Sequence, residues 1–115
     1  MKSDLMYYNN LDSFDKKETI QVFIFELQKI DKRLSLNKET ILETKYYLNS
    51  SQVETCINAE NIILNNTKKF ILNQIYEVLC LIFSTYSIDN IKISDNYKKI
   101  YFICNYQMEE YIIYQ

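Results

Sequence analysis

The residues best suited to chemistry in this chain are carboxylates, because the sequence contains no histidine. Glu39 and Glu43 are four residues apart, so a helix would carry both on one face, and Glu109 and Glu110 are adjacent. Paired carboxylates perform general acid–base catalysis or bind a cation. No histidine and no Asp-x-Asp pattern accompanies either pair, so we interpret them as surface charge. We therefore expect a protein that is not an enzyme.

Other kinds of site are excluded by missing residue types. Without any glycine, the chain has no phosphate-binding loop, which needs glycine for its backbone geometry. The single arginine, Arg33, makes bidentate recognition of phosphate or guanine poor. Cys56, Cys80 and Cys104 are 24 residues apart each time, whereas structural zinc sites use ligands two to four residues apart. We expect buried thiols, no metal site and no cofactor.

The overall composition points to a source rather than to an activity. Ile, Asn, Lys and Tyr make up 52 of the 115 residues, and the codons of these amino acids are rich in A and T. This bias is typical of an AT-rich bacterium, a phage or another mobile element. The net charge of −2 is neither the basic signature of a nucleic-acid-binding protein nor a strongly acidic one.

The spacing of apolar residues predicts one α+β domain over residues 1–115, with about four helices before a C-terminal sheet. Asp15 with Glu18, and Ser51 with Glu54, have the spacing of a capping box at a helix start. Residues 1–14 form a polar entry segment, and residues 15–87 form the helical part. The helices are expected near 15–34, 38–48, 51–58 and 60–87.

Two points of this helical reading stay open. A break is predicted at residues 35–37, with Asn37 capping the second helix. The end of the third helix is open, because this helix either stops near residues 58–61 or runs on into the fourth. Residues 22–25 also fit a short strand, although the helical spacing around them favours a helix.

The longest apolar pattern lies in the fourth expected helix. Residues 70–83 carry apolar side chains on all faces, which predicts a long, buried central helix. Asn73, Gln74 and Glu77 interrupt this run, and it is shorter than the roughly 20 residues that a membrane span needs. Residues 1–10 lack the apolar core of a signal peptide. We expect a cytoplasmic protein that does not bind membranes.

After Ser87 the apolar period changes from that of a helix to that of a strand. Ile100, Phe102 and Cys104 alternate with Lys99, Tyr101 and Ile103. Strands are expected near 90–94, 98–106 and 109–114, which makes residues 88–115 a three-stranded antiparallel meander.

Both faces of this sheet carry large apolar side chains, although only one face can cover the long helix. The face with Tyr101 and Ile103 would be exposed in a monomer, which is typical of an interface, unless the first helix covers it. The last strand is also an edge that could pair with a partner strand. A homodimer through this sheet is therefore possible. The expected interface residues are Tyr97, Tyr101, Ile103, Tyr106, Tyr111 and Tyr114.

These observations predict a small, non-catalytic protein-binding factor. A phage or mobile-element inhibitor of a host system, such as a blocker of bacterial immunity, would have this size and composition. One alternative is a nucleic-acid-binding regulator, because helices followed by a hairpin resemble the outline of a winged helix. The helix before the hairpin is, however, the most apolar one, whereas a recognition helix is basic and polar. A structural subunit of a larger complex is the third possibility.

Overall fold

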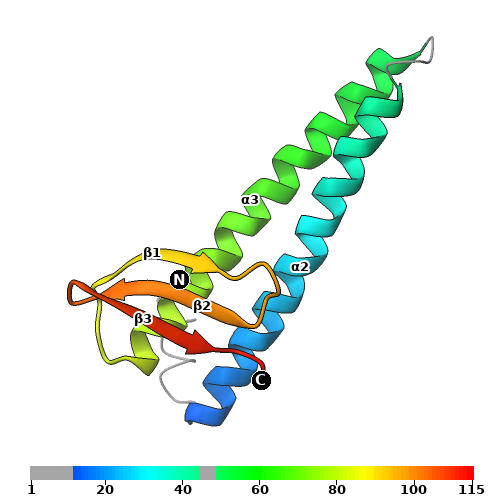
Figure 1. Ribbon diagram of the computed structural model, residues 1–115. Helices are drawn as coiled ribbons and strands as arrows, with labels where there is room; N and C mark the ends of the chain where they lie inside the picture. Colours follow the sequence, from blue (N-terminus) through cyan, green and yellow to red (C-terminus); the bar gives the residue numbers. More distant parts are fainter. Residues whose placement is uncertain (1–11, 45–48) are drawn as a thin grey trace.

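A computed structural model describes residues 12–44 and 49–115, which form two long antiparallel helices followed by a three-stranded antiparallel sheet (Figure 1). The sheet packs against one end of the helical hairpin, and the other end projects as an arm, so the molecule measures 55 × 29 × 25 Å. The strands follow the order β1-β2-β3. The elements are α2 (Ser13–Thr44), α3 (Ser50–Ile82), β1 (Ile88–Ile93), β2 (Lys99–Cys104) and β3 (Gln107–Ile112).

The fold class is α+β with a meander, as expected, but the prediction of about four helices is wrong. Residues 15–34 and 38–44 of the first two expected helices belong to the single helix α2, and residues 51–58 and 60–82 of the last two belong to α3. The alternative of a strand at 22–25 is also wrong, because these residues lie within α2. Residues 45–48 of the expected second helix and 1–11 of the entry segment lie outside the described residues.

The helices continue through the expected breaks because the polar residues there bond to the opposite helix. The side-chain amide of Asn37, only 3% exposed, donates to Asn61 Oδ1 at 2.9 Å. Arg33 donates from Nε and Nη2 to the two carboxylate oxygens of Glu60, at 2.6 and 3.3 Å. A polar side chain that is bonded across the hairpin no longer competes for its own backbone, so it does not end the helix.

The helix ends also differ from the capping boxes in the sequence. Asp12 Oδ1 accepts a hydrogen bond from the backbone N–H of Asp15 at 2.8 Å, so Asp12 caps α2 instead of Asp15. At the start of α3, Asn49 occupies the cap position and makes no side-chain capping bond. The second box at Ser51 therefore lies within the first turn of α3.

The end of α3 comes five residues before the expected one. Ser84 has a φ of 50°, its N–H donates to Leu81 O, and the Thr85 N–H donates to Cys80 O at 2.9 Å. These bonds form a Schellman motif, in which a residue with positive φ ends the helix. The chain then turns toward β1. Glycine is the usual residue at this position, and here serine takes it.

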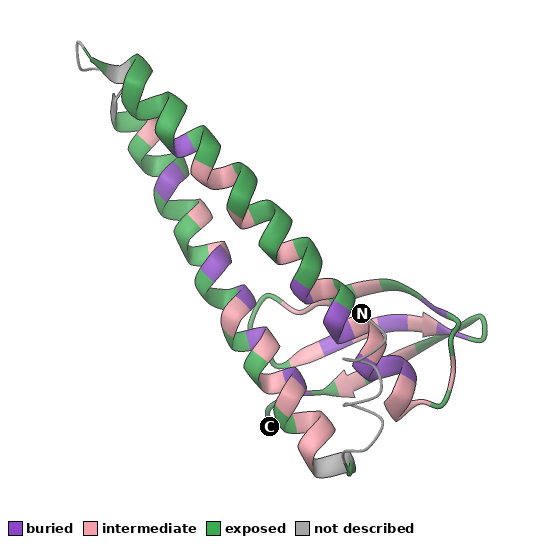
Figure 2. Cartoon of the chain, turned by 180° about the vertical axis from the view of Figure 1, so that it is seen from behind, coloured by how far each residue is buried: buried purple, intermediate pink, exposed green. Residues whose placement is uncertain are grey.

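The core lies where the sheet meets the hairpin. Ile24 and Leu27 of α2, Ile75 and Leu79 of α3, and Phe102 of β2 are almost fully buried there. Buried residues thin out along the arm (Figure 2). The burial expected for residues 70–83 is found from Ile71 to Cys80, where the sheet and α2 cover α3, whereas Phe70 is 54% exposed. Over the described residues, neither helix is long and apolar enough to cross a membrane.

The two faces of the sheet differ in burial, as the alternation in β2 predicts. Ile100, Phe102 and Cys104 are buried toward the helices, whereas Tyr101 and Ile103 between them face outward. A two-residue turn, Asn105 and Tyr106, joins β2 to β3 with φ of 51° and 64°. Two successive positive φ values indicate a type I′ turn, which fixes the β2–β3 register.

Candidate protein-binding surface

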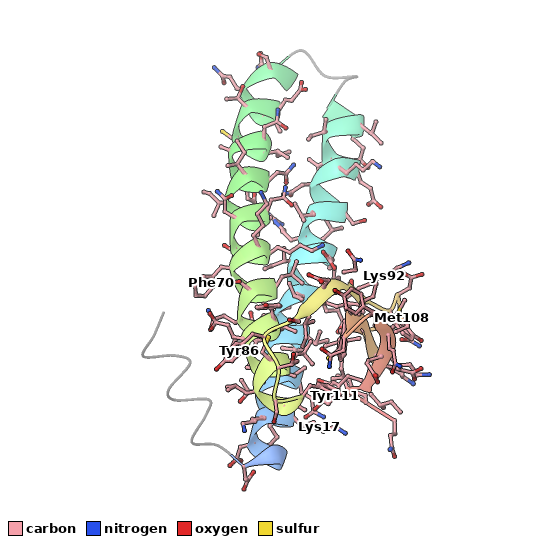
Figure 3. All side chains as sticks on the ribbon, turned by 90° about the vertical axis from the view of Figure 1, so that its left-hand side faces the viewer. Lys17, Phe70, Tyr86, Lys92, Met108 and Tyr111 are labelled. Carbon is pink, nitrogen blue, oxygen red and sulfur yellow. The ribbon has the colours of Figure 1, made fainter. Side chains whose placement is uncertain are left out.

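The outward face of the sheet carries a group of apolar side chains, which we name the outer sheet surface. In the strand register Ile103 lies opposite Met108, and Lys99 lies opposite Ile112. Met108 is 69% exposed and lies on the side of the sheet away from the helices, whereas Tyr111 lies between sheet and helices (Figure 3). The surface consists of Tyr101, Ile103, Met108 and Ile112, together with Tyr106 at the adjoining turn.

Charged side chains of both signs surround this apolar group. Lys92 and Glu110 lie on either side of Tyr101 in the register, and Lys99 Nζ is 3.0 Å from Glu110 Oε1. The hydrogen bond and the charge of Glu110 raise the pKa of Lys99 above its ordinary value, so the lysine is charged at neutral pH. An apolar centre with a polar rim is the arrangement found in protein–protein interfaces.

A shallow depression of about 460 Å³ lies on this face between Lys92, Ser94, Asp95, Tyr101 and Met108. One residue of each strand and two residues of the β1–β2 turn line it.

Tyr106 is unusual because it combines backbone strain with full exposure. Its φ of 64° falls in the left-handed region, which costs a residue with a Cβ roughly 1–2 kcal/mol. Its side chain is fully exposed, so no burial offsets this cost. Glycine is favoured at the second position of a type I′ turn. A large aromatic residue held here contributes nothing to packing, and strain of this kind is found at functional sites.

Tyr97 also has a positive φ, of 59°, but its side chain has a structural role. Its hydroxyl donates to Asp31 Oδ2 at 2.8 Å, and Lys68 Nζ donates to Asp31 Oδ1 at 2.6 Å. Burial and the neighbouring Asp31 carboxylate raise the pKa of Tyr97 to about 12. These three residues, which we name the clasp, join α2, α3 and the β1–β2 turn beside a cavity of about 350 Å³.

The last two expected interface residues also contact the helices. The Tyr111 ring lies edge-to-face against Phe83 with a centroid distance of 6.2 Å, and burial raises its pKa. The Tyr114 hydroxyl donates to Gln21 O at 3.2 Å, while Gln21 Nε2 donates to Ile113 O at 2.9 Å. The structure therefore brings Tyr101, Ile103 and Tyr106 together on the outside, whereas Tyr97, Tyr111 and Tyr114 hold the sheet to the hairpin.

Met108 and Ile112 belong to the outer sheet surface but are not among the expected interface residues. The signal for them was the alternation of residues 107–112, which places both on the face of Tyr101 and Ile103 once the register is known. That register depends on the two-residue turn at Asn105 and Tyr106. The turn lacks the Asn-Gly pair that usually marks a type I′ turn in a sequence, because the chain contains no glycine.

The remaining candidate groups lie apart from one another. Glu39 and Glu43 are exposed on the arm, and Glu110 pairs with Lys99 on the sheet. Cys80 and Cys104 are buried as expected, but Cys56 is exposed, because this part of α3 faces only α2. Within residues 12–44 and 49–115, no three side chains of the metal-binding types gather into a possible metal site.

Comparison of the chain with models of protein families, with curated proteins and with solved structures gives no match. The outer sheet surface, defined by its own geometry, is therefore the basis on which a function is assigned.

Proposed function

We propose that this protein is a small, non-catalytic factor that binds another protein through its outer sheet surface. The observation that carries the proposal is Tyr106, a fully exposed tyrosine held at positive φ beside the exposed Met108. Tyrosine is enriched among the residues that dominate binding energy at protein interfaces. The AT-rich composition favours a phage or mobile-element origin, and with it the role of an inhibitor that occupies a host protein in the cytoplasm.

A protein partner is favoured over nucleic acid. Lys92 and Lys99 on the outer sheet surface are accompanied by Glu110 and Asp89, so the face is not a basic patch. The described part of the chain has two long antiparallel helices before the sheet rather than the helix-turn-helix by which a winged helix reads DNA, which favours a protein partner.

The test compares the wild-type chain with the double variant Tyr106→Gly/Met108→Lys as bait in host extract. We expect the variant to be at least as stable as the wild type, because glycine relieves the strain of the turn. It should nevertheless lose the captured partner, because the tyrosine anchor is gone and a charge enters the apolar centre. Capture by the wild type should change little between about 0.1 M and about 1 M salt, since its contact is mainly apolar.

The matched control is Leu42→Lys, which places the same charge on an exposed apolar residue of the arm. This variant should capture the same partner as the wild type. Retention of that partner by Tyr106→Gly/Met108→Lys would contradict the proposal, and a contact that disappears at high salt would favour nucleic acid. A homodimer through this sheet is the alternative use of the same surface, and in that case Tyr101→Lys/Ile103→Glu lowers the mass from two chains to one.

A further inference from the structure

A second stripe of side chains runs along α3, which we name the α3 stripe: Val53, Cys56, Glu60, Ile63, Thr67 and Phe70. All of them are exposed except Glu60, which is half-buried and paired with Arg33 of α2. The steps along the stripe alternate between three and four residues, which is the a/d spacing of a coiled coil. Ile63 is 64% exposed and Phe70 is 54% exposed. Phe70 points away from the sheet (Figure 3), so the sheet leaves this side of the hairpin accessible.

The inner side of α3 already has a helical partner. Ile57, Leu64, Ile71 and Ile75 follow a separate heptad register toward α2, and Asn61 and Lys68 in that register make the hydrogen bonds to Asn37 and Asp31. The α3 stripe is therefore a second heptad seam, which fits a helix packed along its length.

We propose that the α3 stripe binds the α3 stripe of a second copy of this chain, antiparallel, about a two-fold axis between residues 61 and 62. Antiparallel coiled coils set a positions against d positions, and this axis does so throughout the stripe. Val53 faces the partner's Phe70, Cys56 faces the partner's Thr67, and Glu60 faces the partner's Ile63. The outer layers join the smaller Val53 to the larger Phe70, and the central layers set the methylene groups of Glu60, whose carboxylate is already paired with Arg33, beside Ile63.

The charges along the stripe support the same occupant. Arg33 Nε lies 2.6 Å from Glu60 Oε1, and this ion pair is next to the proposed axis. The two-fold axis therefore brings two such pairs, each without net charge, side by side and in opposite directions. Ala59 and Asn66, which flank the stripe away from α2, carry no charge that would repel a copy. Residues 53–70 span about 27 Å, which together with the adjoining side of α2 gives each copy a plan area of about 500 Å².

The first test measures mass by light scattering or sedimentation equilibrium. The wild type should have twice the chain mass of 13.9 kDa, and Ile63→Glu should have the mass of one chain, because the new carboxylate faces the partner's Glu60. Ile62→Glu is the matched control, since Ile62 is 63% exposed but lies on another side of α3. It should keep the mass of two chains. A monomeric wild type at the highest soluble concentration would overturn the proposal.

Two further variants test the direction and the layers. Ile63→Lys should stay dimeric, because its ammonium can pair with the partner's Glu60, whereas a merely apolar patch would lose the dimer with either charge. In a Cys56→Ser background, Val53→Cys/Phe70→Cys should form a cross-linked dimer on mild oxidation, and Val53→Cys alone should not. The two new thiols of one chain are about 25 Å apart, too far for an internal disulfide.

Each remaining outcome contradicts the arrangement. A disulfide between two Cys56 residues of the wild type would indicate parallel helices. Dissociation by Tyr101→Lys/Ile103→Glu, with Ile63→Glu unaffected, would place the dimer at the sheet instead. Because the α3 stripe and the outer sheet surface lie on different elements, either proposal can fail without the other.

Discussion

Asp31 is the residue that holds the sheet to both helices, since each of its carboxylate oxygens accepts a hydrogen bond from a different element. Tyr97 reaches it from the β1–β2 turn and Lys68 reaches it from α3. Hydrogen bonds to a charged group stabilise a fold more than neutral ones do. The sequence marks Tyr97 as aromatic and Asp31 as one of several charges on α2, but nothing local pairs two residues that are 66 positions apart.

Tyr97→Phe removes this bond and should lower the free energy of unfolding by about 1 to 2 kcal/mol near neutral pH. The folded-state pKa of Tyr97 is raised to about 12 from an ordinary value of 10, so the protonated hydroxyl stabilises the fold below pH 10. That contribution is lost as the pH rises from 10 toward 12. Urea unfolding of both proteins should give a stability difference that shrinks over this range. A difference that stays constant would show that the hydroxyl does not act through its proton.

At the scale of elements, the sequence predicts helices and strands well but not where the helices end. The apolar spacing of residues 60–82 and the alternation of β2 are local patterns, and they predict a helix and a strand at these residues, although not that the helix begins at Ser50. From the sequence, Asn37 is expected to cap a new helix, and residues 58–61, which end at Asn61, fit either a helix end or a continuous helix, because asparagine competes for the backbone of an isolated helix. The side chains of Asn37 and Asn61 bond to each other across the hairpin instead, at 2.9 Å. The outer sheet surface was predicted only in part, because local patterns reveal only some of its residues. Tyr101 and Ile103 follow from the alternation within β2, whereas Met108 requires the β2–β3 register.

The Schellman motif at the end of α3 offers a test of this account. Ser84→Gly should raise the free energy of unfolding by about 0.5 to 1 kcal/mol, because glycine accepts the φ of 50° without strain. Ser87 lies in the same connection without a positive φ, so Ser87→Gly should be neutral or destabilising. Thermal unfolding followed by circular dichroism measures both. Equal effects of the two substitutions would mean that strain at Ser84 does not limit the stability of the helix end.

At the scale of the whole molecule, stability should fall along the 55 Å axis from the sheet to the tip of the arm. The arm, which comprises residues 35–44 of α2 and 50–60 of α3, has Asn37 and Ile57 as its buried residues among those whose side chains the structure describes. The sheet end buries residues of α2, α3, β1 and β2, together with Ile113 just after β3. Helical segments this short are marginal unless they pack against other elements, so the arm depends on a single seam between two helices.

Hydrogen exchange followed by mass spectrometry should therefore find fast amides in the arm and slow amides at residues 20–30 and 71–80. The arm can open locally without breaking the contacts of the sheet end, whereas the core amides require global unfolding. The measurement belongs in the Ile63→Glu variant, in which self-association through the α3 stripe is removed. In the wild type at high concentration, residues 53–60 of α3 should gain more protection than residues 35–44 of α2, because only α3 contributes the stripe. Uniform protection along the hairpin of the variant would show that the two helices unfold as one unit with the sheet, and the arm would then be a rigid extension of the core.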